Sequence, residues 1–205
     1  MKNPFIIKDS FISPKLCEQL TNDLLVTTDL VDTEFDTQTS VVAVDDHTVV
    51  DYIIQLIQPL YKEINELYNV NCKKVEKIFF SYLKNQTNGT PLTCFNSTFS
   101  KEANTWVRTE YNDFTISLFL SSHFNPQEPF DEEYEHVGGK IQFPQHDISI
   151  MGERGGVIIH PSDPHFIRNI SNVTYGTCMV VDILVSCEHL YIYDPITFNN
   201  IKEKQ

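Results

Sequence analysis

The sequence predicts a mainly β protein in which a few helices come first and a β sandwich or barrel follows. Three observations predict it. Apolar residues recur at helical spacing only before about residue 70. After that point the chain breaks into short apolar and aromatic runs separated by turn residues. Its 14 Phe and 9 Tyr suit strands, because aromatic side chains pack well on a pleated surface.

The chain length favours a single domain. Its 205 residues are enough for one well-packed core, and no linker composition divides them. We therefore expect one domain over residues 1–205, with a mostly helical N-terminal part over 1–70 and a β core over 71–195.

Two helices are expected in the N-terminal part. The first begins where Ser13 can cap it and Pro14 takes the first helical position. The second is expected over 46–68, where Val, Ile and Leu recur at helical spacing. Pro59 lies inside this stripe and should kink or split the helix. Between the helices, residues 40–44 (SVVAV) have the character of a strand.

The β core is expected to contain six strands. Each is a short apolar run bounded by turn signals such as Asn88-Gly89, Gly138-Gly139 and Gly155-Gly156. The predicted strands are KVEKIFFSYL (74–83), DFTISLFLS (113–121), KIQFP (140–144), DISIM (147–151), GVIIHP (156–161) and TCMVVDILV (177–185).

The chain is strongly acidic, with a formal net charge of −13 and a sequence pI near 4.8. Such a surface repels phosphate backbones, so we expect no nucleic-acid partner. Acidic residues concentrate at 29–36 and at 130–136. Solvated loops are the simpler interpretation of both stretches, and a docking surface for a basic partner is the alternative.

The sequence shows no signal for export and no membrane span. No apolar run reaches membrane-spanning length, and the N-terminus lacks the apolar core of a signal peptide. The five cysteines are widely spaced and form no CxxC motif (positions 17, 72, 94, 178 and 187). We therefore expect reduced thiols and a cytoplasmic location, or the host cytoplasm or virion for a viral protein.

Several motifs occur in the order and spacing of a known family. They are FISPKLCEQL (11–20), PFDEEYEHVGGKIQFP (129–144), GGVIIHPSDPHFIRNI (155–170) and YGTC (175–178). The pattern resembles the iron(II)- and 2-oxoglutarate-dependent dioxygenases, in particular prolyl-4-hydroxylase-like members of the bacterial and marine-viral type. This resemblance implies a double-stranded β-helix, a cupin-like jelly roll with the helices packed outside and a metal at its open end.

The resemblance makes His165 the distal iron ligand. It also calls for a His-x-Asp pair, which completes a triad of two histidines and one carboxylate. In GTPLTCFNS (89–97) those two positions hold Thr93 and Phe95. A threonine hydroxyl stays protonated at neutral pH, and phenylalanine has no donor atom. His165 is then the retained ligand of a degenerate site or, in the plainer interpretation, a histidine satisfied within a turn.

The co-substrate position is degenerate as well. A Gly-Thr-Arg motif of the family sets a guanidinium against the distal carboxylate of 2-oxoglutarate, and this chain has Cys178 at the arginine position. A thiol cannot make that bidentate pair. Lys140 and Arg168 are candidates to replace the arginine, although solvated surface cations are the simpler interpretation of both.

Other residues are candidates to rescue a metal site. His160 and Asp163 lie close to His165 in the sequence, but Asp163 is also a natural turn residue before a proline. Asp182 lies four residues beyond Cys178 and would face the same side of the strand. It would then point into the barrel as a substitute carboxylate, or lie at a solvated strand end.

Three functional hypotheses follow. The first is a non-catalytic scaffold without cofactor, which acts through an unidentified protein partner or through self-assembly, for example in a viral or bacterial assembly. The second is an active hydroxylase of a peptidyl proline or a small molecule, with Fe(II), 2-oxoglutarate and a rearranged ligand set. The third is a metal-free barrel whose cavity binds a small ligand and is lined by Thr93, Phe95 and Cys178. No catalytic residue is assigned.

Overall fold

The main sheet of the protein has six strands in the order β1-β11-β6-β14-β3-β2. We describe it from a computed structural model that covers residues 2–28, 30, 39–127 and 129–201. All neighbouring pairs in this sheet are antiparallel. The strands are β1 (Ile6–Lys8), β11 (Val157–Pro161), β6 (Phe114–Phe119), β14 (Cys178–Cys187), β3 (Cys72–Leu83) and β2 (Thr39–Ala43).

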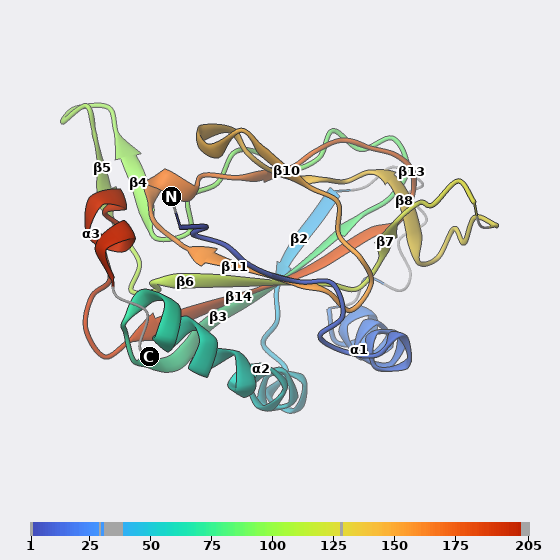
Figure 1. The fold of residues 1–205 in the computed structure, drawn as a ribbon. Helices are drawn as coiled ribbons and strands as arrows, with labels where there is room; N and C mark the ends of the chain where they lie inside the picture. The colour runs from blue at the N-terminus through green and yellow to red at the C-terminus, as the bar shows by residue number, and fades with distance from the viewer. Residues whose placement is uncertain (1, 29, 31–38, 128, 202–205) are drawn as a thin grey trace.

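Two helices cover one face of this sheet, α1 (Pro14–Thr27) and α2 (His47–Tyr68) (Figure 1). Ser13 caps α1 as predicted, because its side chain accepts a hydrogen bond from the Leu16 amide. The apolar stripe of α2 is buried against the sheet, so Pro59 removes one helical hydrogen bond without splitting the helix. The prediction that Pro59 splits the helix is therefore wrong.

Two smaller sheets lie on the opposite side of the main sheet (Figure 1). Together with it they enclose the space between the layers, as in a jelly roll. One sheet has the order β10-β9-β12 and the other β13-β8-β7. Their strands are β7 (Ser122–His123), β8 (Glu135–Gly138), β9 (Ile141–Phe143), β10 (Ile148–Ile150), β12 (Asn169–Ile170) and β13 (Val173–Gly176).

A separate hairpin of β4 (Ser97–Ser100) and β5 (Thr105–Arg108) projects at one end of the molecule, near the short helix α3 (Pro195–Asn200) (Figure 1). The six predicted strands and the predicted strand at 40–44 are all present, and so is the mainly β architecture with helices outside. The sequence did not indicate the hairpin, because its side chains are mostly exposed and show no apolar alternation.

The two acidic stretches have different outcomes. Apart from Leu30, the stretch at 29–36 lies outside the described residues. In the stretch at 130–136, Asp131 to Glu133 are exposed, whereas β8 begins at Glu135 and its His136 is only 2% exposed. The loop interpretation is thus confirmed for its first half alone. No helix of the described residues is long and apolar enough to cross a membrane.

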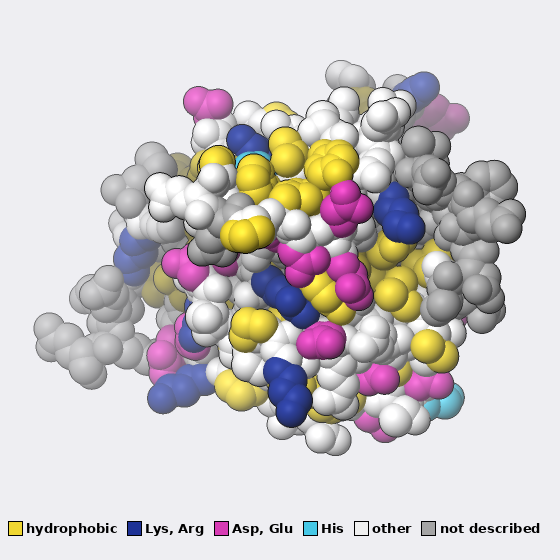
Figure 2. Space-filling model, turned by 90° about the vertical axis from the view of Figure 1, so that its right-hand side faces the viewer, with side chains coloured by type: hydrophobic (Ala, Val, Ile, Leu, Met, Phe, Trp, Pro, Cys, Tyr) yellow, Lys and Arg dark blue, Asp and Glu magenta, His cyan; other side chains and the backbone are white. Residues whose placement is uncertain are grey.

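Figure 2 shows the end of the molecule that lies on the right in Figure 1. Hydrophobic side chains there alternate with basic and with acidic ones, and neither sign of charge covers the face. The described basic side chains of this face therefore form no continuous surface of the kind that binds phosphate backbones.

Candidate functional site

A cavity of about 470 Å³ lies on the face of the main sheet that is turned away from the helices. Its floor consists of alternate side chains of neighbouring strands, because every second residue of a strand points to the same face. Ser81 of β3 and Asp182 and Leu184 of β14 belong to this floor. Residues 90–98 and Arg168 form the opposite wall.

A buried ion pair connects the two walls. The Arg168 Nη2 atom donates to Asp182 Oδ1, and the side chains are only 2% and 5% exposed. Ser117 of β6 donates a second hydrogen bond to the same oxygen, at 2.7 Å. The carboxylate is therefore neutralised and hydrogen-bonded inside the barrel, which is the condition for keeping a charge there.

Arg168 is held at this position by a short backbone ladder. The Thr93 amide donates to the Arg168 carbonyl at 2.8 Å, and the Arg168 amide donates to the Thr93 carbonyl at 3.1 Å. Phe95, two residues further along the same segment, lies beneath the guanidinium, whose carbon is 4.9 Å from the ring centroid. The ring thus faces a cation, and a cation–π contact adds to the ion pair.

Arg168 lines the cavity, whereas His165 does not. His165 lies in a one-turn 3₁₀ helix (Pro164–Phe166), and its side chain is 55% exposed. Its ring lies against Asp163 and Tyr193 on the surface. The residue that the ladder sets opposite Thr93 is Arg168, three positions later. Of its two interpretations, the histidine in a turn describes His165 as the structure shows it.

The interpretation of Arg168 as a solvated surface cation is therefore wrong, and so is the solvated strand end for Asp182. Both side chains are buried and paired with each other. The sequence did not indicate this pair, because Asp182 lies on β14 whereas Arg168 lies just before β12, 14 positions earlier. Lys140 does not line the cavity; its backbone amide donates to Ser171 Oγ.

Cys178 is buried but does not line the cavity with Thr93 and Phe95, so that part of the predicted lining is wrong. Its thiol points to the Gly139 carbonyl, with Sγ 3.6 Å from the oxygen. Burial, and secondarily the charge of Asp182, raises the pKa of this thiol to about 12. Cys178 is thus a protonated core residue at neutral pH.

His160 and Asp163 each have a structural role. His160 is fully buried among the rings of Phe5, Phe143 and Phe166. Asp163 caps the 3₁₀ helix through Oδ1, and its Oδ2 accepts the Tyr193 amide at 2.9 Å. The turn role predicted for Asp163 is therefore confirmed.

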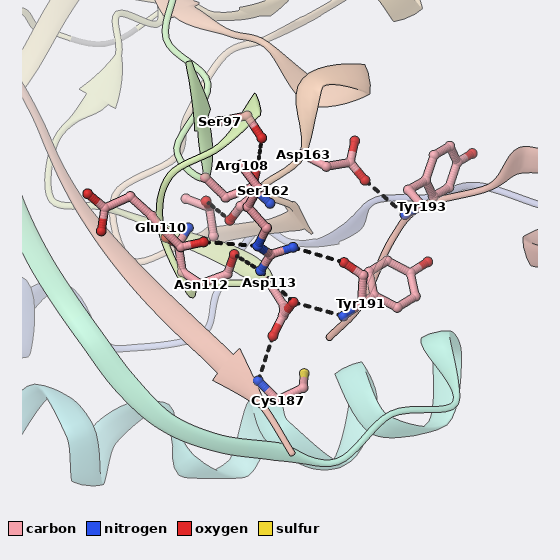
Figure 3. Close-up of polar contacts among 12 residues, drawn as sticks. Ser97, Arg108, Glu110, Asn112, Asp113, Ser162, Asp163, Cys187, Tyr191 and Tyr193 are labelled. Atoms are coloured by element: carbon pink, nitrogen blue, oxygen red, sulfur yellow. Dashed lines mark hydrogen bonds and ion pairs between the residues drawn. The ribbon is translucent and has the colours of Figure 1, made fainter. Parts of the chain in front are cut away.

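A second polar cluster lies beside the site, and the sequence did not indicate it (Figure 3). Arg108, at the end of β5, donates to the backbone carbonyls of Glu110, Asn112 and Tyr191. Its Nη2 also lies 2.8 Å from Asp113 Oδ1. Arg108 thereby fastens the β4–β5 hairpin to the end of the main sheet.

The same cluster holds the C-terminal arm, which we define as residues 188–193. Asp113 is 2% exposed and accepts the amides of Cys187 at 2.8 Å and Tyr191 at 2.9 Å (Figure 3). A buried carboxylate with three donors, two of them backbone groups, fixes the course of the arm after β14.

Two buried histidines predict a pH dependence of stability. Burial lowers the pKa of His160 to about 3 and that of His136 to about 4. Unfolding returns both to about 6.5, so the unfolded chain binds more protons between these values and pH 6.5. Their contribution to stability is complete above pH 6.5 and decreases as the pH falls below it. Each histidine should cost about 1.4 kcal/mol per pH unit there.

Denaturant unfolding between pH 7.5 and pH 5 tests this expectation. His160→Phe should keep the aromatic packing and flatten the pH dependence, whereas an exposed control, His189→Phe, should not. An unchanged slope in His160→Phe would show that His160 is solvated or already charged in the native protein.

Iron(II) does not fit the residues that line this cavity. A dioxygenase-type site needs two histidines and a carboxylate. Here Thr93 and Phe95 supply no ligand, Arg168 places a cation inside the barrel, and the Asp182 carboxylate is already engaged by Arg168 and Ser117. Within the described part of the chain, no group of three His, Cys, Asp or Glu residues is placed to hold a metal.

No protein-family model and no curated protein matches the sequence at a significant level. Solved structures do match the fold. A viral collagen prolyl hydroxylase from Paramecium bursaria Chlorella virus 1, in complex with 2-oxoglutarate, has a TM-score of 0.61 at 14% identity, over 89% of this chain and 96% of its own. A Pseudomonas putida prolyl-4-hydroxylase has a TM-score of 0.61 at 11% identity, over 92% and 95%.

A prolyl hydroxylase from Trichoplax adhaerens, bound to a peptide of the hypoxia-inducible factor oxygen degradation domain, has a TM-score of 0.63 at 12% identity. The match covers 91% of this chain and 85% of that one. The chain therefore has the fold of the prolyl-4-hydroxylase-like dioxygenases, and the predicted jelly roll is confirmed. At this level of identity the likeness establishes the fold alone.

Proposed function

We propose that this chain is a non-catalytic protein with the dioxygenase fold, which acts by binding and not by iron chemistry. The observation that carries the proposal is the buried ion pair of Arg168 and Asp182. It places a guanidinium in the barrel and uses the neighbouring carboxylate to neutralise it. An Fe(II) ion at that place would meet a like charge and no histidine.

The barrel does not depend on a metal for its stability. Its strands bury apolar side chains that need no cofactor, including Phe80, Ile116, Leu118, Val180 and Ile183. The fold can therefore serve as a scaffold after the chemistry of its relatives is lost. We expect the surface of the scaffold to bind a protein partner or a second copy of the chain. The net charge of −13 disfavours nucleic acid.

The cavity itself supports a second candidate function, which is binding of a small molecule without metal. Its volume of about 470 Å³ lies in the range of ligand sites. Phe79, Phe95 and Leu184 give it an apolar surface, and Ser81 and Thr93 add hydroxyl groups. That mixture of an apolar wall with a few polar groups is typical of small-molecule sites.

Anaerobic calorimetric titration of the metal-free protein with Fe(II), with and without 2-oxoglutarate, tests the proposal. We expect no saturable heat in either case, because the ligand positions hold Thr93, Phe95 and Arg168. The control is His165→Ala, which should behave like the unmodified protein. The same titration with 2-oxoglutarate alone reports on binding in the metal-free cavity.

Saturable binding of one Fe(II) per chain would contradict the proposal. If His165→Ala or Asp182→Asn then abolished that binding, the chain would be the alternative, a hydroxylase with a rearranged ligand set. Product formation from a proline-containing peptide, with release of succinate, would establish the activity.

A further inference from the structure

Cys72 and Cys187 face each other at one end of the β3–β14 ladder. Cys72 is the first residue of β3, Cys187 is the last residue of β14, and the strand register pairs them directly. Both are partly exposed, and both sulfurs are free thiols. The pair lies outside the barrel cavity, since neither residue lines it.

The backbone amides of both cysteines bond elsewhere. The Cys72 amide donates to Asn65 Oδ1 at 2.8 Å. The Cys187 amide donates to Asp113 Oδ2, also at 2.8 Å (Figure 3). Neither amide is therefore directed to the facing cysteine. This is the arrangement of a non-hydrogen-bonded pair in an antiparallel ladder.

The next pair along the ladder agrees with this assignment. The Glu188 amide donates to the Asn71 carbonyl at 2.9 Å, as expected beside a non-hydrogen-bonded pair. In such pairs the Cα atoms are about 4.5 Å apart. Disulfides span Cα separations of about 4.4 to 6.8 Å, so the backbone of the two strands already has a spacing that a disulfide accepts.

The two thiols also influence each other. The neighbouring Cys72 thiol raises the pKa of Cys187, and burial adds to the effect. The phenol of Tyr61 on α2 lies beside both sulfurs, and burial raises its pKa to about 12, with the two cysteines adding to the effect. A bond between the sulfurs thus requires little movement of either strand.

We propose that Cys72 and Cys187 are a redox-active dithiol, which a small disulfide such as oxidised glutathione converts into an intramolecular disulfide. The proposal is independent of the function of the cavity. In a reducing compartment the pair remains as two thiols, and a shift to oxidising conditions closes it.

The exchange takes place in two steps. Cys72, as thiolate, attacks one sulfur of glutathione disulfide, and one glutathione leaves as thiolate. Cys187 then loses its proton to solvent and attacks the Cys72 sulfur, and the second glutathione leaves. The protein gives up two electrons and two protons, and the oxidant becomes two molecules of glutathione. The exchange balances equally with the two cysteines in the opposite order, since each step uses one thiolate and releases one glutathione.

The disulfide would add a covalent link at one end of the β3–β14 ladder. Cys72 follows the turn after α2, and Cys187 precedes the C-terminal arm that Asp113 holds. The closed loop spans residues 72–187, which includes most of the barrel. Closing so long a loop restricts the unfolded chain strongly, so oxidation should raise the midpoint of thermal unfolding by about 5 to 15 °C.

The remaining cysteines serve as internal controls. Cys17 and Cys178 are buried, and the Cys94 thiol points to the Ser162 carbonyl. None of the three has a cysteine opposite it in the strand registers of the described residues. A specific disulfide should therefore involve positions 72 and 187 alone.

The experiment treats the folded full-length chain with glutathione disulfide, unfolds it in excess iodoacetamide, and measures the intact mass. We expect three alkylated cysteines in place of five, reversal by dithiothreitol, and a linked peptide pair that contains Cys72 and Cys187. The thermal midpoint should rise on oxidation in the unmodified chain and in Cys94→Ser, but not in Cys72→Ser.

Three outcomes would overturn the proposal. They are alkylation of all five cysteines after oxidation, a stable glutathione adduct on Cys72 with no internal link, and a linked pair other than 72 and 187. Because the readout on the unmodified chain needs no variant, a folding defect in Cys72→Ser would leave the test intact.

Discussion

Replacing Asp182 by alanine should lower the free energy of unfolding by about 3 to 5 kcal/mol, because the Arg168 guanidinium would then stay buried without its counter-charge. The Ser117 hydroxyl, which donates to the same carboxylate at 2.7 Å, would lose its acceptor as well. Urea unfolding followed by circular dichroism measures the change. A loss this large is a substantial fraction of the stability of an ordinary domain.

The double variant Arg168→Met, Asp182→Leu is the matched control. Replacing both charges by apolar groups of similar size removes the unpaired charge, so its stability should return close to that of the unmodified chain. The difference between the double variant and the sum of its two matching single variants, Arg168→Met and Asp182→Leu, gives the coupling energy. A cost below about 1 kcal/mol for Asp182→Ala would show that water screens the pair.

Replacing Asp113 by alanine should have an effect of similar size, about 3 to 5 kcal/mol. In the variant the amides of Cys187 and Tyr191 would lose their acceptor, and Arg108 would lose its counter-charge. The loss is expected to be local as well as global, since the C-terminal arm would no longer be fixed to the end of β14.

Hydrogen exchange distinguishes the local effect from the global one. Amides of residues 188–193 should exchange faster in Asp113→Ala under conditions where α2 remains protected. Asp194→Ala is the control, because this exposed residue caps only the short helix α3 and should cost about 1 kcal/mol. Equal losses in the two variants would mean that Asp113 acts as an ordinary surface carboxylate.

Local patterns predicted the elements of the fold well. Ser13 and Asp46 cap the two helices at their predicted starts. The helix α2 continues through Pro59 and keeps its apolar stripe buried. The strands were recognised because they are short apolar runs bounded by turn residues. The short strand β1 was missed because three residues are too few to show a period.

The candidate site was predicted less completely. The sequence indicated that Thr93 and Phe95 had replaced metal ligands, and both residues line the cavity. It assigned the remaining ligand to His165, whereas the ladder sets Arg168 opposite Thr93. His165 lies within the 3₁₀ turn Pro164–Phe166, and a turn of that kind changes which side chain faces inward.

The sequence did not predict contacts between residues that are far apart in the chain. Cys72 and Cys187 lie on strands that are far apart in the sequence although they pair in the sheet. Two register shifts in β14 precede the pairing of the two cysteines. A shift of one residue turns a side chain to the other face of the sheet. The sequence of one strand therefore does not predict which residue of the other strand lies opposite. Arg108 and Asp113 were overlooked because their partners are mostly backbone groups, which no motif records.

The sequence by itself determined the type and order of the main elements and the acidic character of the chain, and it predicted a degenerate metal site at Thr93 and Phe95. These properties depend on residue type and short-range periodicity. Only the tertiary structure decided that Arg168 and Asp182 neutralise each other inside the barrel and that two cysteines meet at its end. Both depend on strand register, which is set by the packing of the whole core and not by any one segment.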